Sequence, residues 1–251
     1  MQSTYPAFAN HQFMKRIYTV LKQRRPDSVM DVHCSFKPNM AVWAYADIIW
    51  TGEHWYHLRD VGAKDGYISA ELPLDMFRAE FMGHPIGVAA ELLHYRLTGN
   101  KDAEPALEPF ARLLATSLLH DVPIRIRARD TGYFKMMRKL WKVRDRFGVK
   151  AADKLFCWNN HDYVSLSPQK CYATLMKHPK NGVLAFISNL RQDAQTVNIH
   201  LQLEKLGLLG TKLDVFNVLT EEPVDMTADG KISVPLGSEA WVYVWVRPNG
   251  R

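Results

Sequence analysis

The sequence has few cysteines, no long apolar run and no signal-peptide pattern in its first residues. Its 251 residues include three cysteines, Cys34, Cys157 and Cys171, which are too few and too scattered for a disulfide framework or a zinc site. No run approaches the ~18 apolar residues that a membrane span requires. The N-terminus lacks the charged start and apolar core of a signal peptide. We therefore expect a soluble chain without metal or cofactor, whose localisation the sequence leaves open.

Several common catalytic motifs are also missing. There is no Gly-x-Ser-x-Gly elbow, which excludes a standard α/β-hydrolase nucleophile. There is no glycine-rich phosphate loop of the P-loop or Rossmann type. Glu53, His54 and His57 form E-H-x-x-H, but a zinc-peptidase helix needs two histidines four residues apart with a glutamate between them. This spacing does not favour a metal site.

Positive charge exceeds negative charge, with a formal net charge of +6. Part of the excess gathers in residues 125–146, and basic stretches of this kind can bind phosphate backbones. Here acidic and apolar residues and a tryptophan interrupt the basic ones, and no nucleic-acid motif accompanies them. A solvated helix face is therefore favoured over nucleic-acid binding.

The first 150 residues alternate between helical and strand patterns. Phe13, Ile17, Tyr18 and Leu21 have helical spacing, and Pro73 is placed to open a helix. Helix, strand, short helix and strand in this order are typical of an α/β layer with parallel strands. The predicted helices are 7–24, 40–45, 73–81, 86–97, 104–119 and 131–146, and the predicted strands are 28–34 and 47–50.

After residue 155 the pattern changes to short runs rich in β-branched and aromatic residues. Turn signals separate them, and Trp241, Tyr243 and Trp245 alternate with valines as in a strand. This part predicts an antiparallel sandwich. We therefore expect two domains, 1–150 and 151–251. The six predicted strands are 170–178, 182–190, 196–203, 212–219, 231–235 and 240–246, with one helical turn between residues 203 and 209.

The order of the two parts resembles the C-terminal portion of (β/α)8-barrel glycoside hydrolases. The stretches GVLAFISNLRQDAQTVNIHLQLEKLGL, DVFNVLTEEPV and ISVPLGSEAWVYVWVRP are similar to their terminal sandwich. Upstream, DVHCS, ADIIWTGEHW and FRAEFMGHPIG resemble late barrel strands with their loops. The resemblance implies a partial barrel followed by a sandwich, and a protein that acts on a carbohydrate.

A complete barrel of this kind takes about 250 residues, yet only 150 residues precede the predicted sandwich. Two or three barrel strands fit into that length. We therefore expect the chain to be the C-terminal part of a longer enzyme, to be completed by a missing N-terminal barrel segment or by an oligomer. The alternative is an α/β layer that is not a barrel.

Candidate catalytic residues lie where predicted parallel strands end, since barrel enzymes hold their reactive groups there. Asp31 and His33 are two residues apart on one strand and share a face. Glu53 follows the next strand after Gly52, where the backbone can bend. Glycoside hydrolysis usually needs two carboxyl groups. Glu53 and Asp31 are the predicted pair.

The residues around this pair are candidates for substrate binding. Aromatic rings suit the apolar faces of sugars, and histidine or arginine can hydrogen-bond hydroxyl groups. The predicted substrate-binding residues are His33, His54, Trp55, Tyr56 and Arg78. Structural roles are the alternative, with Asp31 as a cap and His33 in the core. At the level of the chain, the alternatives are a non-catalytic glycan-binding module and an interaction protein that uses the basic helix.

Overall fold

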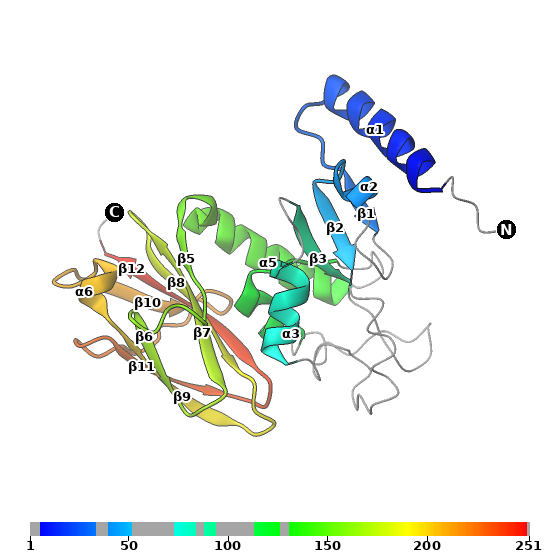
Figure 1. The fold of residues 1–251 in the computed structure, drawn as a ribbon. Helices are drawn as coiled ribbons and strands as arrows, with labels where there is room; N and C mark the ends of the chain where they lie inside the picture. The colour runs from blue at the N-terminus through cyan, green and yellow to red at the C-terminus, as the bar shows by residue number, and fades with distance from the viewer. Residues whose placement is uncertain are drawn as a thin grey trace. The chain divides into compact units, whose positions relative to one another are not determined.

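The computed structural model describes residues 6–33, 40–51, 73–83, 88–93, 113–125 and 131–249 (Figure 1). Contacts within the chain define two compact units. The first contains Met1–Lys101 and Val122–Arg127, and the second contains Asp102–Asp121 and Ala128–Arg251. The domain boundary at residue 150 stays a prediction, and residues 128–150 group by their contacts with the sandwich that follows them.

The first unit is built on a parallel sheet, as the sequence predicts. Neighbouring strands pair in parallel in the order β1-β2-β3-β4, with His33 opposite Trp50 and Trp50 opposite Glu91. Parallel neighbours in chain order require a crossover between each pair of strands, which is the βα repeat of α/β proteins. The strands are β1 (Asp31–His33), β2 (Ile48–Thr51), β3 (Ala89–Leu93) and β4 (Ile124–Arg125).

Strand β3 corrects one expectation, because the helix predicted at 86–97 is wrong. Ala89, Glu91 and Leu92 favour helix by intrinsic propensity. In the fold, their backbone pairs with β2 on one side and β4 on the other. Pairing on both sides and the burial of Ala90 and Leu92 outweigh the local preference.

Helices predicted near residues 7–24, 40–45 and 73–81 are confirmed. They are α1 (Pro6–Arg24), α2 (Met40–Trp43) and α3 (Leu74–Arg78), which continues into the π-helical turn η3 (Ala79–Gly83). One side of α1 packs on its own unit through buried Met14. Lys22 Nζ lies 3.1 Å from Asp47 Oδ1, and Asp47 Oδ2 accepts a hydrogen bond of 2.8 Å from the Met30 N–H. These contacts tie the end of α1 to the start of the sheet.

The second unit contains the antiparallel sandwich, and all six predicted strands are confirmed. One sheet has the order β10-β12-β8-β7-β5 and the other β11-β9-β6. The short strands β5 and β6 were not predicted. The strands are β5 (Asp153–Leu155), β6 (Val164–Ser167), β7 (Cys171–His178), β8 (Gly182–Asn189), β9 (Gln195–Leu201), β10 (Leu213–Asn217), β11 (Lys231–Leu236) and β12 (Trp241–Pro248), with the helical turn α6 (Leu203–Leu206) after β9.

Every residue of β8 is buried, so both faces of this central strand are covered. Val183, Ala185 and Ile187 belong to the core between the two sheets. The opposite face carries Leu184 and Phe186, which have no exposed surface. A strand that is apolar on both faces needs a layer on each side.

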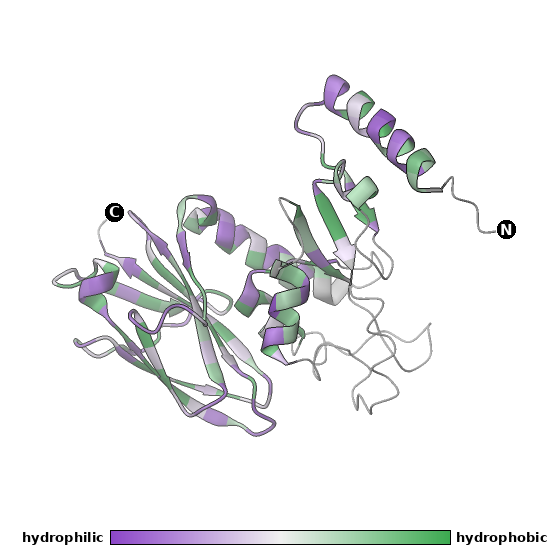
Figure 2. Ribbon diagram, viewed as in Figure 1, coloured by the Kyte–Doolittle hydropathy of each residue, from purple (hydrophilic) through white to green (hydrophobic). Residues whose placement is uncertain are grey.

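The outer layer consists of the helical segment 113–120, which ends in the 3-10 turn η4 (Leu118–His120), and of α5 (Thr131–Phe147). Ser188 Oγ donates a hydrogen bond of 2.7 Å to the Ala115 carbonyl, and Thr174 Oγ1 one of 2.6 Å to the Leu119 carbonyl. Phe147 of α5 meets Trp245 edge to face, with centroids 5.5 Å apart. In Figure 2, α5 carries both polar and apolar residues, as expected for a helix with one buried side.

A polar network links this outer layer to the sheet. Arg144 Nη2 lies 2.6 Å from Asp121 Oδ1, and Lys154 Nζ contacts the same carboxylate. Arg144 Nη1 also donates a hydrogen bond of 3.3 Å to the Tyr243 hydroxyl. Burial raises the pKa of Tyr243 to about 12, although Arg144 acts in the opposite direction. Arg144 therefore connects α5, the loop at Asp121 and strand β12.

Candidate active site

One face of the parallel sheet is polar, while the other is apolar. Ile49, Leu92 and Ile124 are buried on the apolar face. The polar face carries a cluster of five side chains that we call the sheet-face cluster. Its residues come from four adjacent strands, and alternation along each strand turns them to the same side. They are Asp31 and His33 of β1, Trp50 of β2, Glu91 of β3 and Arg125 of β4.

Arg125 is the centre of the sheet-face cluster. Its Nη1 contacts Asp31 Oδ2 and lies 3.5 Å from Glu91 Oε2. Its guanidinium carbon lies 4.5 Å from the centroid of the Trp50 ring. The ring of His33 stacks on Trp50 at a centroid distance of 3.8 Å and an angle of 14°. The cluster thus joins two carboxylates through one cation, beside a stacked aromatic pair.

The two carboxyl groups of the sheet-face cluster have different surroundings. Burial raises the pKa of Glu91, and the negative charge of Asp31 raises it further, while Arg125 opposes both effects. The Asp31 side chain is the more exposed of the two, and it makes the direct contact with Arg125. Glu91 therefore keeps a proton more readily than an ordinary glutamate. A carboxyl group with a raised pKa is suited to donate a proton in acid–base chemistry.

The structure describes three of the seven predicted site residues. Asp31 and His33 lie on one face of β1, as their spacing predicts, and both belong to the sheet-face cluster. Arg78 is the last residue of α3 and is exposed. Glu53, His54, Trp55 and Tyr56 lie outside the described residues. The functional roles of all seven residues stay predictions.

Sequence reasoning missed Glu91 and Arg125. Glu91 was assigned to a helix, and the two-residue strand that carries Arg125 is too short to show a period. The available signal was the run Gly87-Val88-Ala89-Ala90, a small-residue stretch that can enter a buried parallel strand. Reading that run as a strand would have placed Glu91 next to Trp50.

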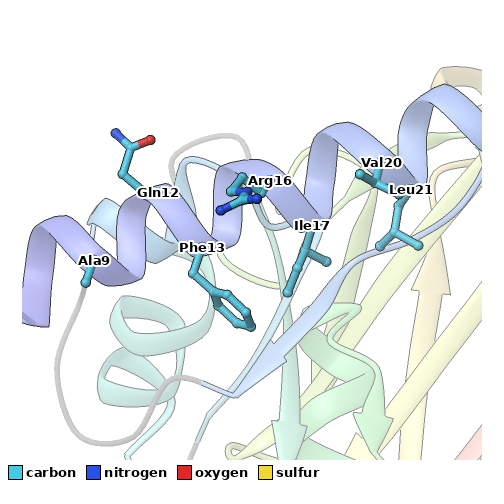
Figure 3. Close-up of a pocket in the computed structure, with 7 residues that line it drawn as sticks. All are labelled: Ala9, Gln12, Phe13, Arg16, Ile17, Val20 and Leu21. Atoms are coloured by element: carbon cyan, nitrogen blue, oxygen red, sulfur yellow. The ribbon is translucent and has the colours of Figure 1, made fainter.

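A second surface feature lies along α1 and has a different character. Figure 3 shows a hollow lined by side chains of this helix alone. Most of them are apolar, and Phe13 and Val20 are 61% and 48% exposed. A large exposed apolar face is typical of a surface that packs against another part of a protein. The hollow on α1 lacks the converging polar groups of a sugar site. The lining residues are Ala9, Gln12, Phe13, Arg16, Ile17, Val20 and Leu21.

No group of three or more His, Cys, Asp or Glu side chains in the described ranges is placed to hold a metal ion. In the same part of the chain, no helix has the length and apolar character needed to cross a membrane.

Comparisons with known proteins agree with this architecture. Residues 136–222 match the family model "Glycoside hydrolase 123, C-terminal domain". This match begins within α5 and extends through most of the sandwich. A comparison with curated proteins finds no match.

Solved structures of glycosidases share the fold at low sequence identity. A maltogenic α-amylase, AmyB from Thermotoga neapolitana, is 13% identical with a TM-score of 0.55, and the match covers 98% of this chain and 60% of that one. An Anoxybacillus α-amylase is 13% identical with a TM-score of 0.54, covering 96% and 57%. A GH27 β-L-arabinopyranosidase from Geobacillus stearothermophilus is 11% identical with a TM-score of 0.50, covering 96% and 55%.

This chain therefore spans about 55–60% of the length of these three structures. The resemblance predicted from the sequence is confirmed, in the sandwich by the family match and over nearly the whole chain by the fold. The chain has the architecture of the C-terminal part of a barrel glycosidase, in which a parallel α/β sheet leads into a terminal sandwich that carries the match to the glycoside hydrolase 123 C-terminal domain.

Proposed function

We propose that this chain is the C-terminal part of a glycoside hydrolase, and that the polar face of its parallel sheet forms part of the carbohydrate site. The observation that carries the proposal is the meeting of Asp31 and Glu91 at Arg125. Glycosidases use two carboxyl groups on either side of the scissile bond, one as proton donor and one as nucleophile or base. The match of residues 136–222 to a glycoside hydrolase domain supports the same class of reaction.

The surroundings of each group suggest how the roles divide. Glu91 has the raised pKa and suits the donor that protonates the leaving oxygen. Asp31 is the more exposed carboxylate and makes the direct contact with Arg125, and it suits the nucleophile or the base.

Glu53 remains the third candidate carboxylate. It follows β2, whose Trp50 belongs to the sheet-face cluster. In a parallel sheet, groups that follow neighbouring strands meet at the same edge, where barrel enzymes hold their catalysts. We propose that Glu53 contributes to cleavage or binding from that edge, with His54, Trp55 and Tyr56 contacting the sugar. Arg78 is proposed as a further substrate-binding residue, from its position in α3.

Two features support the proposal that the chain belongs to a longer enzyme. The related structures are longer than this chain. The polar sheet face is open to solvent at Asp31 and His33, whereas parallel sheets are usually covered on both faces. Further barrel strands would close this face into an interior and cover the apolar side of α1. Such strands would also complete the substrate site.

The test is hydrolysis of a panel of aryl glycosides by the purified chain. Three variants, Asp31→Asn, Glu53→Gln and Glu91→Gln, are compared with Glu204→Gln, which changes an exposed glutamate of the sandwich unit in the same way. We expect at least a ~100-fold loss of kcat/KM in the variant that removes a true catalyst, since general acid–base catalysis contributes 10²–10⁴-fold. Folded wild-type protein with no turnover on any sugar would refute an autonomous enzyme.

A non-catalytic glycan-binding module is the second candidate, and the position of Arg125 favours it. The Arg125 guanidinium contacts both carboxylates and offsets their negative charge. Such a site suits the binding of a sugar as well as its cleavage. His33 stacks on one face of Trp50, and the guanidinium lies over the same ring. Sugar binding without hydrolysis, lost in Arg125→Gln and kept in Glu204→Gln, would establish this function.

A further inference from the structure

Helix α5 has an exposed face that the proposed carbohydrate site does not use. Met137, Leu140 and Phe147 are buried, none of them more than 2% exposed, and Phe147 packs on Trp245 of the sandwich. Phe134 and Trp141 lie away from Leu140 and Phe147 around the helix and are 46% and 42% exposed. These two residues are seven apart, which brings them to the same side of the helix about two turns apart. Two large aromatic side chains thus lie open to solvent on one helix.

Arg138 shares this side of α5, and Lys135, Lys139 and Lys142 lie on the adjoining side. All four cations are exposed, and the exposed carboxylate Asp145, four residues after Trp141, lies on the aromatic side. Within the described part of the chain, the three lysines have no carboxylate within ion-pair distance. Among the described residues, no ion pair offsets the positive charge of these lysines. Unpaired charge of one sign attracts a partner of the opposite sign.

The aromatic and cationic groups of this side touch one another. The rings of Phe134 and Trp141 meet edge to face, with centroids 6.0 Å apart and an angle of 84°. The Arg138 guanidinium carbon lies 5.7 Å from the Phe134 centroid. The three side chains thus form one continuous patch, which we call the α5 patch. Lys135, Lys139 and Lys142 flank it.

We propose that the α5 patch binds an anionic polysaccharide that carries uronate carboxylates. Indole and phenyl rings contact the apolar faces of sugars, and the surrounding cations match carboxylates repeated along a chain. A neutral glycan would leave the lysines without partners. The family match begins at residue 136, within this helix, so the patch overlaps the segment related to a glycosidase domain. That overlap favours a sugar polymer over a nucleic acid.

The test is affinity electrophoresis and calorimetry with polygalacturonate, with neutral starch and duplex DNA as comparison ligands. One variant carries Lys135→Glu, Lys139→Glu and Lys142→Glu. Its matched control carries Lys150→Glu, Lys180→Glu and Lys212→Glu, which changes three exposed lysines away from the patch and alters the net charge equally. Trp141→Ala and Phe134→Ala probe the rings, and circular dichroism verifies folding of each variant.

We expect wild-type protein to bind polygalacturonate and the patch triple variant to bind at least about tenfold more weakly, a loss of ~1.4 kcal/mol. Trp141→Ala should also weaken binding, while the control triple variant should stay within about twofold. Added salt should weaken binding, since the contacts are ionic. Equal losses in both triple variants, or no binding by the wild type, would overturn the proposal. Tighter binding of DNA than of polygalacturonate would overturn it in favour of nucleic acid.

This inference is independent of the hydrolytic site. The α5 patch variants should leave any activity on small aryl glycosides unchanged, because a single glycoside lacks the repeated carboxylates that the α5 patch is proposed to bind. Conversely, Asp31→Asn and Glu91→Gln should leave polygalacturonate binding intact. Failure of one proposal can therefore be distinguished from failure of the other.

Discussion

Replacing Arg144 with methionine should destabilise the sandwich unit strongly. The Asp121 side chain is only 8% exposed, and among the described residues it pairs with Arg144 and Lys154. Removing one member of a buried ion pair typically costs ~3–5 kcal/mol, because the remaining charge stays buried. Lys154 still contacts Asp121, and Arg144 is 20% exposed, so we expect the lower end, about 3 kcal/mol. The Tyr243 hydroxyl would lose its donor as well.

The assay is urea unfolding followed by tryptophan fluorescence, with Arg138→Met as the matched control. Arg138 lies on the exposed side of the same helix, so its replacement should change the free energy of unfolding by no more than about 0.5 kcal/mol. The double variant Asp121→Asn with Arg144→Met should be ~1 kcal/mol or more stable than Arg144→Met alone, since it removes the buried carboxylate charge that has lost its Arg144 partner. Asparagine suits the left-handed backbone of Asp121, where φ is 55°. A loss below about 1 kcal/mol in Arg144→Met, or no recovery in the double variant, would refute this account.

Three further changes have defined outcomes. Gly182→Ala should lose at least ~2 kcal/mol of stability, because φ is +81° and a Cβ would lie 2.2 Å from the Val246 carbonyl oxygen. Gly210→Ala is the control for backbone strain alone, since its φ is +73° and its Cβ would enter open space. Equal losses of stability in the two variants would contradict a steric clash at Gly182. The pKa of Tyr243 is raised from 10.0 to about 12, so wild-type stability should fall as the pH rises between those values. In chemical unfolding, the stability of Tyr243→Phe should fall less steeply over the same pH range. Because burial and Asp31 raise the pKa of Glu91 above 4.5, wild-type stability should fall as the pH rises from 4.5 through the pKa of Glu91 in the folded protein. The measurement is thermal unfolding against pH. The same fall in a Glu91→Gln variant would rule out Glu91 as the cause of the decline.

The sandwich strands were predictable because their local signals agree with the fold. Alternation of Trp241, Tyr243 and Trp245 with valines identifies β12. The layers on each side could not be read from that alternation. Val242, Val244 and Val246 enter the core between the sheets, whereas Tyr243 and Trp245 face α5 through Arg144 and Phe147. Both faces are apolar, so the sequence pattern alone does not distinguish the inner layer from the outer one.

The sheet-face cluster was predictable only in part. A spacing of two residues on a recognisable strand was enough to place Asp31 and His33 on one face. Glu91 could not be placed, because Ala, Glu and Leu favour helix locally and only pairing with β2 and β4 makes a strand of this segment. Arg125 reaches Asp31 across 94 positions of sequence. A contact of that range leaves no local pattern.

The complete burial of β8 limits where the gene can be cut if this sandwich is transferred to another protein. A gene rearrangement that cut the chain near residue 150 and joined the sandwich to a new neighbour would leave Leu184, Phe186 and Tyr243 open to water. The transferred piece would then be prone to aggregation. A stable transferred domain must therefore include the segment around 113–121 and helix α5. The segment accepts the hydrogen bonds from Ser188 and Thr174, and α5 packs on Trp245. We therefore expect relatives of this sandwich to carry an equivalent of α5 wherever they occur.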